Sequence, residues 1–248
     1  MYAAGITDVG VLRTQNQDAI FFSRDKVGPL PNLFVVADGM GGHNAGDVAS
    51  IQALEVFTSY IRDYPLPELV LPADYLDMMV TAATRANHAV FSHSQKYDSL
   101  TGMGTTLTAC IIESNKAVIV HVGDSRMYGI KPGGINQLTS DHSFVEEMIQ
   151  LGQLTAEEAK VHPKRHMLTR VLGTDATLQV DGIIRDLAGC TALLLCSDGL
   201  TNMVTNERIL EIINNPGYVE HRTQNLINEA NQNGGRDNIS AILIDIGR

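Results

Sequence analysis

The sequence predicts an α+β fold in which antiparallel sheets are packed against helices. Strand-like and helix-like segments come in blocks instead of strict β-α-β alternation, which favours antiparallel sheets. Two long amphipathic segments each have one apolar face that must be buried against a sheet. The 248 residues are 44% hydrophobic, which is ample for one sizeable core. No Pro/Gly/Ser-rich linker or internal repeat divides the chain, so we expect a single domain over residues 1–248.

The first half of the chain alternates between strand and helix signals. A Gly28-Pro29 turn separates two strand-like runs, residues 11–22 and 33–37. Apolar residues recur at helical spacing over residues 47–64, and prolines then stop that helix. A second helix is expected over residues 73–96.

The second half begins with a strand pair and ends on a strand. The strand pair is expected over residues 105–112 and 116–128, and a polar stretch follows with short helices at 143–151 and 155–160. The remaining predicted elements are strands 178–184, 191–196 and 239–246 and helices 207–213 and 219–231.

Composition excludes several classes of partner. The formal net charge is −10, whereas nucleic acids and anionic membranes require a basic surface. The N-terminus lacks the basic and apolar regions of a signal peptide, and no apolar run approaches the ~20 residues of a membrane span. The three cysteines, Cys110, Cys190 and Cys196, form no C-x-x-C pair, which favours free thiols in a reducing compartment. We therefore expect a cytoplasmic protein with no nucleic-acid or membrane partner.

Four aspartates stand at the ends of apolar, strand-like runs. Asp38, Asp124 and Asp198 follow such runs, and Asp237 precedes the last one. In antiparallel sheets the end of one strand lies beside the start of its neighbour, so these carboxylates can meet at one edge. Like charges at close range repel strongly, and a cluster of oxygen ligands suits hard divalent metal ions.

Two of these features have simpler alternatives. Asp38-Gly39 alone is also consistent with a glycine-rich turn before the helix at residue 47. Arg13 can form a surface ion pair with Asp18, or it can grip a phosphate bidentately, as lysine cannot.

The order of short motifs resembles the metal-dependent serine/threonine phosphatases of the protein phosphatase 2C (PPM) family, in particular bacterial members. The matching motifs cover nearly the whole chain, and it is the ordered set that makes the resemblance specific. They are R13-x-x-NQD18, D38GMGGH43, G104TT106, V122GDSR126, L138T-x-DHS143, H162P-x-RH-x-LTR170, S197DGL200 and D237NIS240.

The resemblance implies a metal centre with two core ions, Mn²⁺ or Mg²⁺, and a third ion. Asp38 matches the carboxylate that bridges the two core ions, and Gly39 matches the residue whose carbonyl binds the first. Asp198 and Asp237 match ligands of the second ion. Asp124 matches a ligand of the third ion, shared with Asp198.

The resemblance also implies roles around these ions. Asp18 matches a carboxylate that contacts metal-bound water, and Arg13 matches the phosphate-binding arginine. Animal members have a histidine general acid where this chain has Met40, so either His43 or a water protonates the leaving group. Some members have glutamate at the position of Gln17. Residues 144–173 match a flap beside the site.

The implied fold is a central sandwich of two antiparallel sheets flanked by helices. The implied activity is hydrolysis of phosphoserine and phosphothreonine in proteins, by direct attack of a metal-bridging hydroxide. We expect a monomer whose functional opponent is a cognate serine/threonine kinase. The alternatives are an inactive phosphoprotein-binding module, which the intact metal-ligand aspartates argue against, and a phosphatase for small phosphoesters.

Several other residues are expected to be structural. His121, His142, His162 and His166 match no metal ligand of the family. No Cys-x5-Arg phosphate loop surrounds Cys196, so this thiol is expected to be structural instead of nucleophilic. Thr105 and Thr106 are expected to support the site through hydroxyl hydrogen bonds.

Overall fold

The computed structural model describes residues 1–41, 45–65 and 71–247, which form two antiparallel sheets. The five-stranded sheet has the order β1 (Tyr2–Asp8), β11 (Ile239–Asp245), β10 (Ala192–Cys196), β7 (Arg126–Lys131) and β8 (Gly134–Gln137). The six-stranded sheet has the order β2 (Asp18–Ser23), β3 (Leu33–Met40), β5 (Leu107–Glu113), β6 (Lys116–Val122) and β9 (Asp181–Asp186), and β4 (Gly104–Thr105) pairs with β3.

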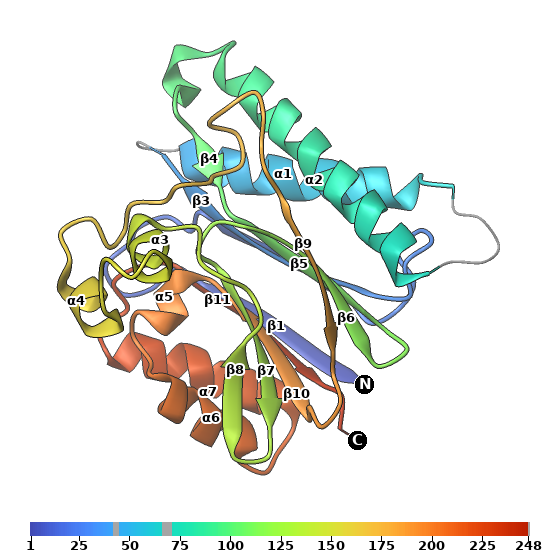
Figure 1. The fold of residues 1–248 in the computed structure, drawn as a ribbon, viewed down its shortest axis with the longest axis vertical. Coiled ribbons are helices and arrows are strands. Elements are labelled where there is room, and N and C mark those ends of the chain that lie inside the picture. Colours follow the sequence, from blue (N-terminus) through green and yellow to red (C-terminus); the bar gives the residue numbers. More distant parts are fainter. Residues whose placement is uncertain (42–44, 66–70, 248) are drawn as a thin grey trace.

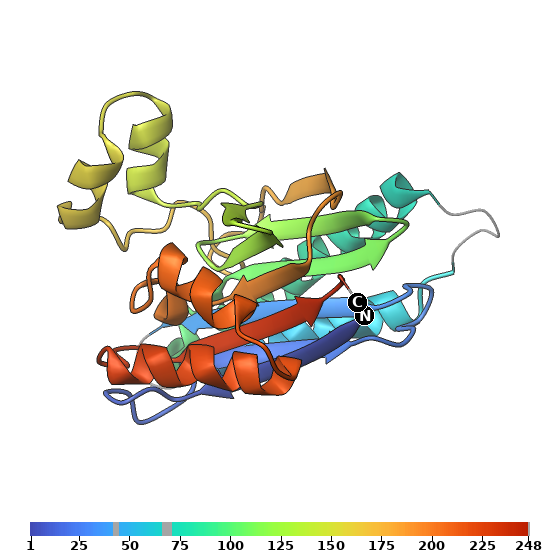
Figure 2. The same ribbon diagram turned by 90° about the horizontal axis from the view of Figure 1, so that it is seen from below.

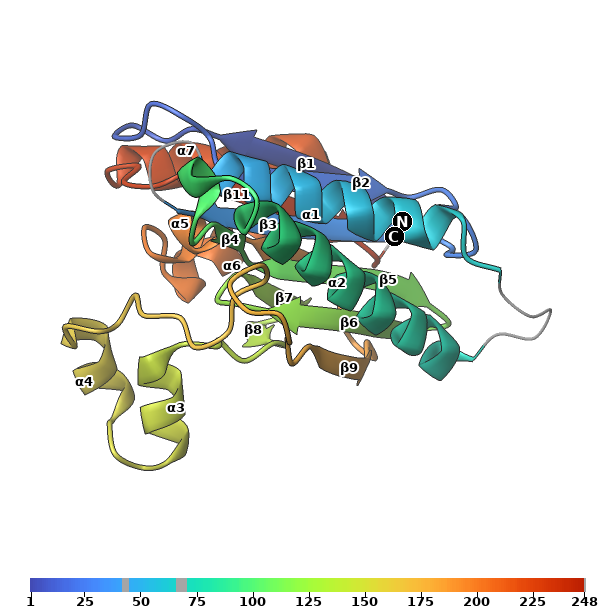
Figure 3. The same ribbon diagram turned by 90° about the horizontal axis from the view of Figure 1, so that it is seen from above.

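The long helices cover the outer faces of the two sheets (Figure 1). Helices α1 (Ala45–Arg62) and α2 (Pro72–Ser94) lie over the six-stranded sheet, as Figure 3 shows from above. Helices α6 (Asn206–Asn214) and α7 (Val219–Gln232) lie over the five-stranded sheet. The expected α-β-β-α arrangement is therefore confirmed.

Three short helices lie at one end of the sandwich. Helix α5 (Asp198–Thr201) follows β10 directly, whereas α3 (Phe144–Gln150) and α4 (Ala156–Val161) project away from the body (Figures 2 and 3). A 3₁₀ turn at Asp98–Leu100 follows α2. We call residues 144–169, which contain α3 and α4, the flap.

Apolar side chains fill the space between each pair of layers. Phe57 of α1 and Met79 of α2 pack on the six-stranded sheet, and Leu226 of α7 packs on the five-stranded sheet. Phe34 and Leu195 meet between the two sheets. Burying one such side chain contributes about 1.5–3 kcal/mol. Within the described residues, no helix has both the length and the apolar character needed to cross a bilayer.

Some predicted boundaries were wrong for identifiable reasons. Residues 11–17 form a loop before β2, because the N–H groups of Val11 and Leu12 donate to the Gly235 carbonyl, at 2.8 and 3.1 Å, and not to a neighbouring strand. The expected strand 116–128 is two strands in different sheets, since the chain turns at Gly123, where φ is +105°. Strands β1 and β8 were not predicted; β1 carries only small buried side chains, Ala3 and Ala4.

Candidate metal centre and phosphate site

The predicted aspartates converge at one end of the sandwich, beside the flap. Asp38, Asp124, Asp198 and Asp237 line a cavity of about 610 Å³. Asp38 comes from the six-stranded sheet, and Asp198 and Asp237 flank β10 and β11 of the other sheet. The cavity therefore lies where the two sheets meet, and its acidic lining requires both.

Strand register places Asp38 beside Asp18. The two residues are direct partners across β2 and β3, so their side chains lie on the same face. Hydrogen bonds from the neighbouring threonines fix the Asp38 backbone. Thr106 Oγ1 accepts from the Asp38 N–H at 3.0 Å, and the Asp38 carbonyl accepts from Thr106 N at 2.8 Å and Thr105 Oγ1 at 2.9 Å. The expected supporting role of both threonines is confirmed.

Close backbone packing explains why residue 39 is glycine. A Cβ at Gly39 would lie 2.0 Å from the Gly46 carbonyl oxygen and 2.5 Å from the Gln17 carbonyl oxygen. The Gly39 N–H donates to the same Gln17 carbonyl at 3.1 Å. The end of β3 is thus held tightly against the start of α1, with Gly39 in the cavity wall.

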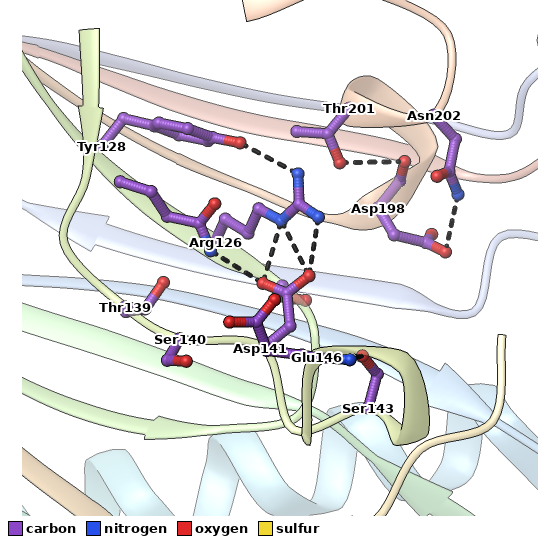
Figure 4. Close-up of polar contacts among 12 residues, drawn as sticks. Arg126, Tyr128, Thr139, Ser140, Asp141, Ser143, Glu146, Asp198, Thr201 and Asn202 are labelled. Carbon is purple, nitrogen blue, oxygen red and sulfur yellow. Dashed lines mark hydrogen bonds and ion pairs between the residues drawn. The ribbon is translucent and has the colours of Figure 1, made fainter. Parts of the chain in front are cut away.

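Asp198 and Asp18 are held by neighbouring polar side chains. Asn202 Nδ2 donates to Asp198 Oδ2 at 2.9 Å, one turn along α5 (Figure 4). Ser197 Oγ donates to Asp18 Oδ2 at 2.8 Å. The sequence predicted no role for Ser197, the first residue of the S197DGL200 motif, or for Asn202, which lies two residues after that motif.

Burial and crowding make this cluster unfavourable as a set of free carboxylates. The pKa of Asp18 is raised to about 7, mainly by burial and also by the nearby charges of Asp198 and Asp237. Burial, followed by the charge of Asp198, raises the pKa of Asp124 to about 7. Asp38 has a pKa well above its ordinary value, mainly through burial and then through Asp18.

The donor set fits hard divalent cations. Asp18 Oδ1 is buried and has no hydrogen-bond partner among the described residues. Within those residues, no three aspartate, glutamate, histidine or cysteine side chains form a group that could by their present positions hold a metal ion. Ions such as Mg²⁺ retain several waters and need only one or two carboxylates, so an open cluster of oxygen donors is appropriate.

Arg13 lies at the mouth of the cavity. Its Nη2 atom is 2.9 Å from Asp237 Oδ2, and both side chains are about half exposed, at 50% and 40%. The ion pair with Asp18, one of the two alternatives for Arg13, does not form in the structure, because residues 11–17 fold as a loop along the Gly235 segment. An exposed ion pair of this kind is weak, so the guanidinium is available to an anionic ligand.

The structure describes two of three other residues named in the sequence analysis. His43 lies outside the described residues. Cys196 is fully buried, and burial raises its pKa to about 12, which confirms a structural thiol. His166 lines the cavity, a position that its motif did not predict. A second hollow of about 1080 Å³ runs from Asp124, Asp198 and Asp237 between the flap and α5–α6.

The chain is similar to proteins of one known family. The protein phosphatase 2C family model matches residues 13–243. The serine/threonine phosphatase stp of Listeria innocua is 36% identical over 99% of this chain and 96% of its own length. The solved structure of Stp1 from Staphylococcus aureus has a TM-score of 0.91 at 35% identity and covers 98% of this chain and 94% of that one.

A third relative was solved with metal bound. The catalytic domain of the serine/threonine protein phosphatase PstP, in complex with two manganese ions, has a TM-score of 0.82. It is 32% identical and covers 98% of this chain and 97% of that one.

Proposed function

The chain belongs to the protein phosphatase 2C family, and from that premise we propose that it is a metal-dependent phosphatase that hydrolyses phosphoserine and phosphothreonine in proteins at the Asp38 cavity. The observation that carries this proposal is the convergence of Asp38, Asp124, Asp198 and Asp237 on one cavity with Arg13 at its mouth. The carboxylates suit cations, and the guanidinium suits phosphate.

The residues would hold the ions as follows. Asp38, the Gly39 carbonyl, Asp198 and Asp237 would hold the two core ions, with Asp38 as the ligand that both would share. Asp124, together with Asp198, holds a third ion. Manganese is supported by the two-manganese structure of PstP, and Mg²⁺ is the alternative. When bound, the ions supply the positive charge that lowers the pKa of a coordinated water and neutralises the phosphate.

Asp18 and Arg13 complete the arrangement. The unpartnered Asp18 Oδ1 accepts a hydrogen bond from water and orients it toward the phosphorus. Arg13 leaves its weak pair with Asp237 and binds two phosphate oxygens, which fixes the ester for in-line attack. Either His43 or a water delivers the proton to the departing seryl or threonyl oxygen.

The dimensions of the site favour a protein substrate. The two hollows share Arg13, Asp124, His166, Asp198 and Asp237, so they form one continuous depression. A combined cleft of this size exceeds what a single phosphate group needs and leaves room for the flanking peptide. We propose that the protein acts as a monomer and that a cognate serine/threonine kinase opposes it.

The proposal is tested by comparing a phosphoserine peptide with a nucleoside monophosphate, with Mn²⁺ present. We expect the kcat/KM for the peptide to exceed that for the nucleotide at least tenfold, and both activities to fall with Asp38→Asn. A higher kcat/KM for the nucleotide would favour a phosphatase for small phosphoesters. No turnover of either substrate would favour a binding module.

A further inference from the structure

The dipeptide Asp141-His142 lies between the Asp124 loop and the flap. Residues 123–125 connect β6 to β7 and carry the chain from one sheet to the other. Asp141 and His142 directly precede Ser143, which caps the first flap helix by accepting from Glu146 N at 3.3 Å. The dipeptide belongs to the L138T-x-DHS143 motif, from which the sequence predicts a structural role for His142 and no role for Asp141.

Asp141 holds the chain on one side of Asp124. Arg126 Nε lies 2.9 and 3.0 Å from the two Asp141 carboxylate oxygens, and Arg126 Nη2 donates to Oδ2 at 2.6 Å (Figure 4). Gln137 Nε2 also donates to Asp141, and Arg126 Nη1 donates to the Tyr128 hydroxyl. A forked contact of this kind fixes orientation as well as distance.

His142 holds the chain on the other side of Asp124. Its N–H donates to the Gly123 carbonyl at 2.8 Å, and the Gly123 N–H donates back to His142 Nδ1 at 3.1 Å. Because Nδ1 accepts, the ring is neutral with its proton on Nε2. Gly123 also packs closely against Thr106, since a Cβ at this position would lie 2.5 Å from the Thr106 side chain.

The same histidine holds both ends of the flap. The His142 carbonyl accepts from Thr169 N at 2.9 Å, and Phe144 N donates to the Met167 carbonyl at 2.8 Å. His142 Nε2 is 3.2 Å from Asp181 Oδ2, and Arg170 Nη1 donates to Asp181 Oδ1 at 2.7 Å. Both ends of the flap therefore lie beside His142, which forms two hydrogen bonds with Gly123.

We propose that Asp141 and His142 are positioning residues that transmit displacement of the flap to Asp124. The contacts form a continuous physical connection from Arg170, through His142, to Gly123. A substrate that shifts the flap would thereby adjust the carboxylate proposed to hold the third ion. The role of Asp124 in this inference rests on the proposed function, whereas the coupling between the flap and Gly123 does not.

The test uses amide hydrogen exchange in the metal-free protein, followed by NMR at Gly123 and Thr169. The perturbing variant is Arg170→Gln, which removes the ion pair with Asp181; among the described residues Arg170 has no hydrogen bond or ion pair with Asp124. We expect the Gly123 amide to exchange about 2- to 30-fold faster, the range of coupling along such connections. Acceleration at Thr169 with no change at Gly123 would overturn the proposal.

Two control variants separate coupling from general loosening. Arg170→Lys keeps the positive charge beside Asp181 and should restore slow exchange at Gly123. Lys160→Gln removes one positive charge from an exposed flap ion pair with Glu157 and should leave Gly123 unchanged. If Lys160→Gln accelerates Gly123 as much as Arg170→Gln does, loss of flap charge is the cause and the proposal fails.

A double-variant experiment then tests the route. In a His142→Asn background, verified as folded by circular dichroism, Arg170→Gln should produce no further acceleration in residues 124–126. Acceleration of the same size as in the wild-type background would show that His142 is not the link. If His142→Asn does not fold, the Arg170→Lys comparison decides the proposal. Absence of Mn²⁺-dependent peptide hydrolysis in the wild type would contradict the proposed function and leave these exchange results standing.

Discussion

Asp18 and Asp38 stand directly opposite each other on the antiparallel strands β2 and β3. Side chains at such a pair have Cβ atoms about 4.5–5.5 Å apart, so the two acids are held side by side. Asp18 is only 8% exposed, and one of its oxygens has no partner among the described residues. The pair is therefore unstable as two carboxylates and becomes favourable when cations are bound.

Removing metal should abolish activity and lower stability together. We expect a chelator to stop hydrolysis of a phosphoserine peptide and Mn²⁺ to restore it, because the oxygen-rich site holds the catalytic charge. Mn²⁺ at 100 times its Kd should stabilise the fold by about 2.7 kcal/mol, measured as a shift in Tm. Full activity in protein shown by elemental analysis to be metal-free would contradict this prediction.

Asp38→Asn should separate activity from stability. Turnover should fall by orders of magnitude, because the loss of one bridging charge weakens metal binding. In chelator, the free energy of unfolding should rise, since a buried carboxyl whose pKa is raised has been replaced by a neutral amide. Asp198→Asn and Asp237→Asn should also reduce turnover. The matched control, Asp63→Asn, changes an exposed acid just after α1 and should affect neither quantity.

The stability of the metal-free protein should depend on pH through Asp18. Burial raises its pKa from 3.8 to about 7, so between these values the folded state holds a proton that the unfolded state has released. Raising the pH through this window therefore destabilises the fold, by up to ~1.4 kcal/mol per pH unit for one proton.

The effect of Asp18 must be isolated by difference. Burial lowers the pKa of His121 to about 4, and this histidine changes stability in the opposite direction below its ordinary pKa of 6.5. The free energy of unfolding of the wild type minus that of Asp18→Asn, in chelator, should fall from pH 4 to pH 7. A constant or rising difference would show that Asp18 is ionised in the metal-free fold.

Arg13→Ala should raise KM and lower kcat for an aryl phosphate. The guanidinium contacts phosphate in both the ground state and the transition state, and charged hydrogen bonds contribute about 1.5–3 kcal/mol. The kcat/KM should thus fall roughly 10- to 150-fold, and Arg13→Lys should recover only part of it. Arg24→Ala, at another exposed arginine, serves as the control. A change in KM alone would show that Arg13 stabilises the ground state and the transition state equally.

His43→Ala should have small and equal effects on two substrates of different leaving group. An aryl phosphate needs little protonation, whereas a phosphoserine peptide needs more. We expect a water to donate this proton, because His43 does not occupy the position of the animal enzymes' acid. A selective, large loss of kcat with the peptide would instead identify His43 as the general acid.

The site could be predicted from sequence more completely than the strands that build it. The motifs around Asp38 and Asp198 are short and local, so they survive errors in strand boundaries. The turn at Gly123 was not predicted because apolar residues resume at Met127, shortly after it. Nothing local shows that β6 and β7 belong to different sheets. The contacts of Asp141 and His142 were likewise not predictable, since their partners lie 15 and 19 residues away and depend on tertiary packing.

Pairing of the first strand with the last has a consequence for how the protein is made. Tyr2 of β1 is aligned with Asp245 of β11, and β11 also separates β1 from β10. While the chain emerges from the ribosome, the edges of β1 and β10 that pair with β11 therefore remain unpaired until the C-terminal segment has been made. These edges are open to pairing with other chains. Asp237, just ahead of β11, is the last of the proposed ligands to be synthesised. An incomplete chain consequently lacks both the closing strand and one of the proposed ligands, so we expect partly synthesised protein to have no phosphatase activity.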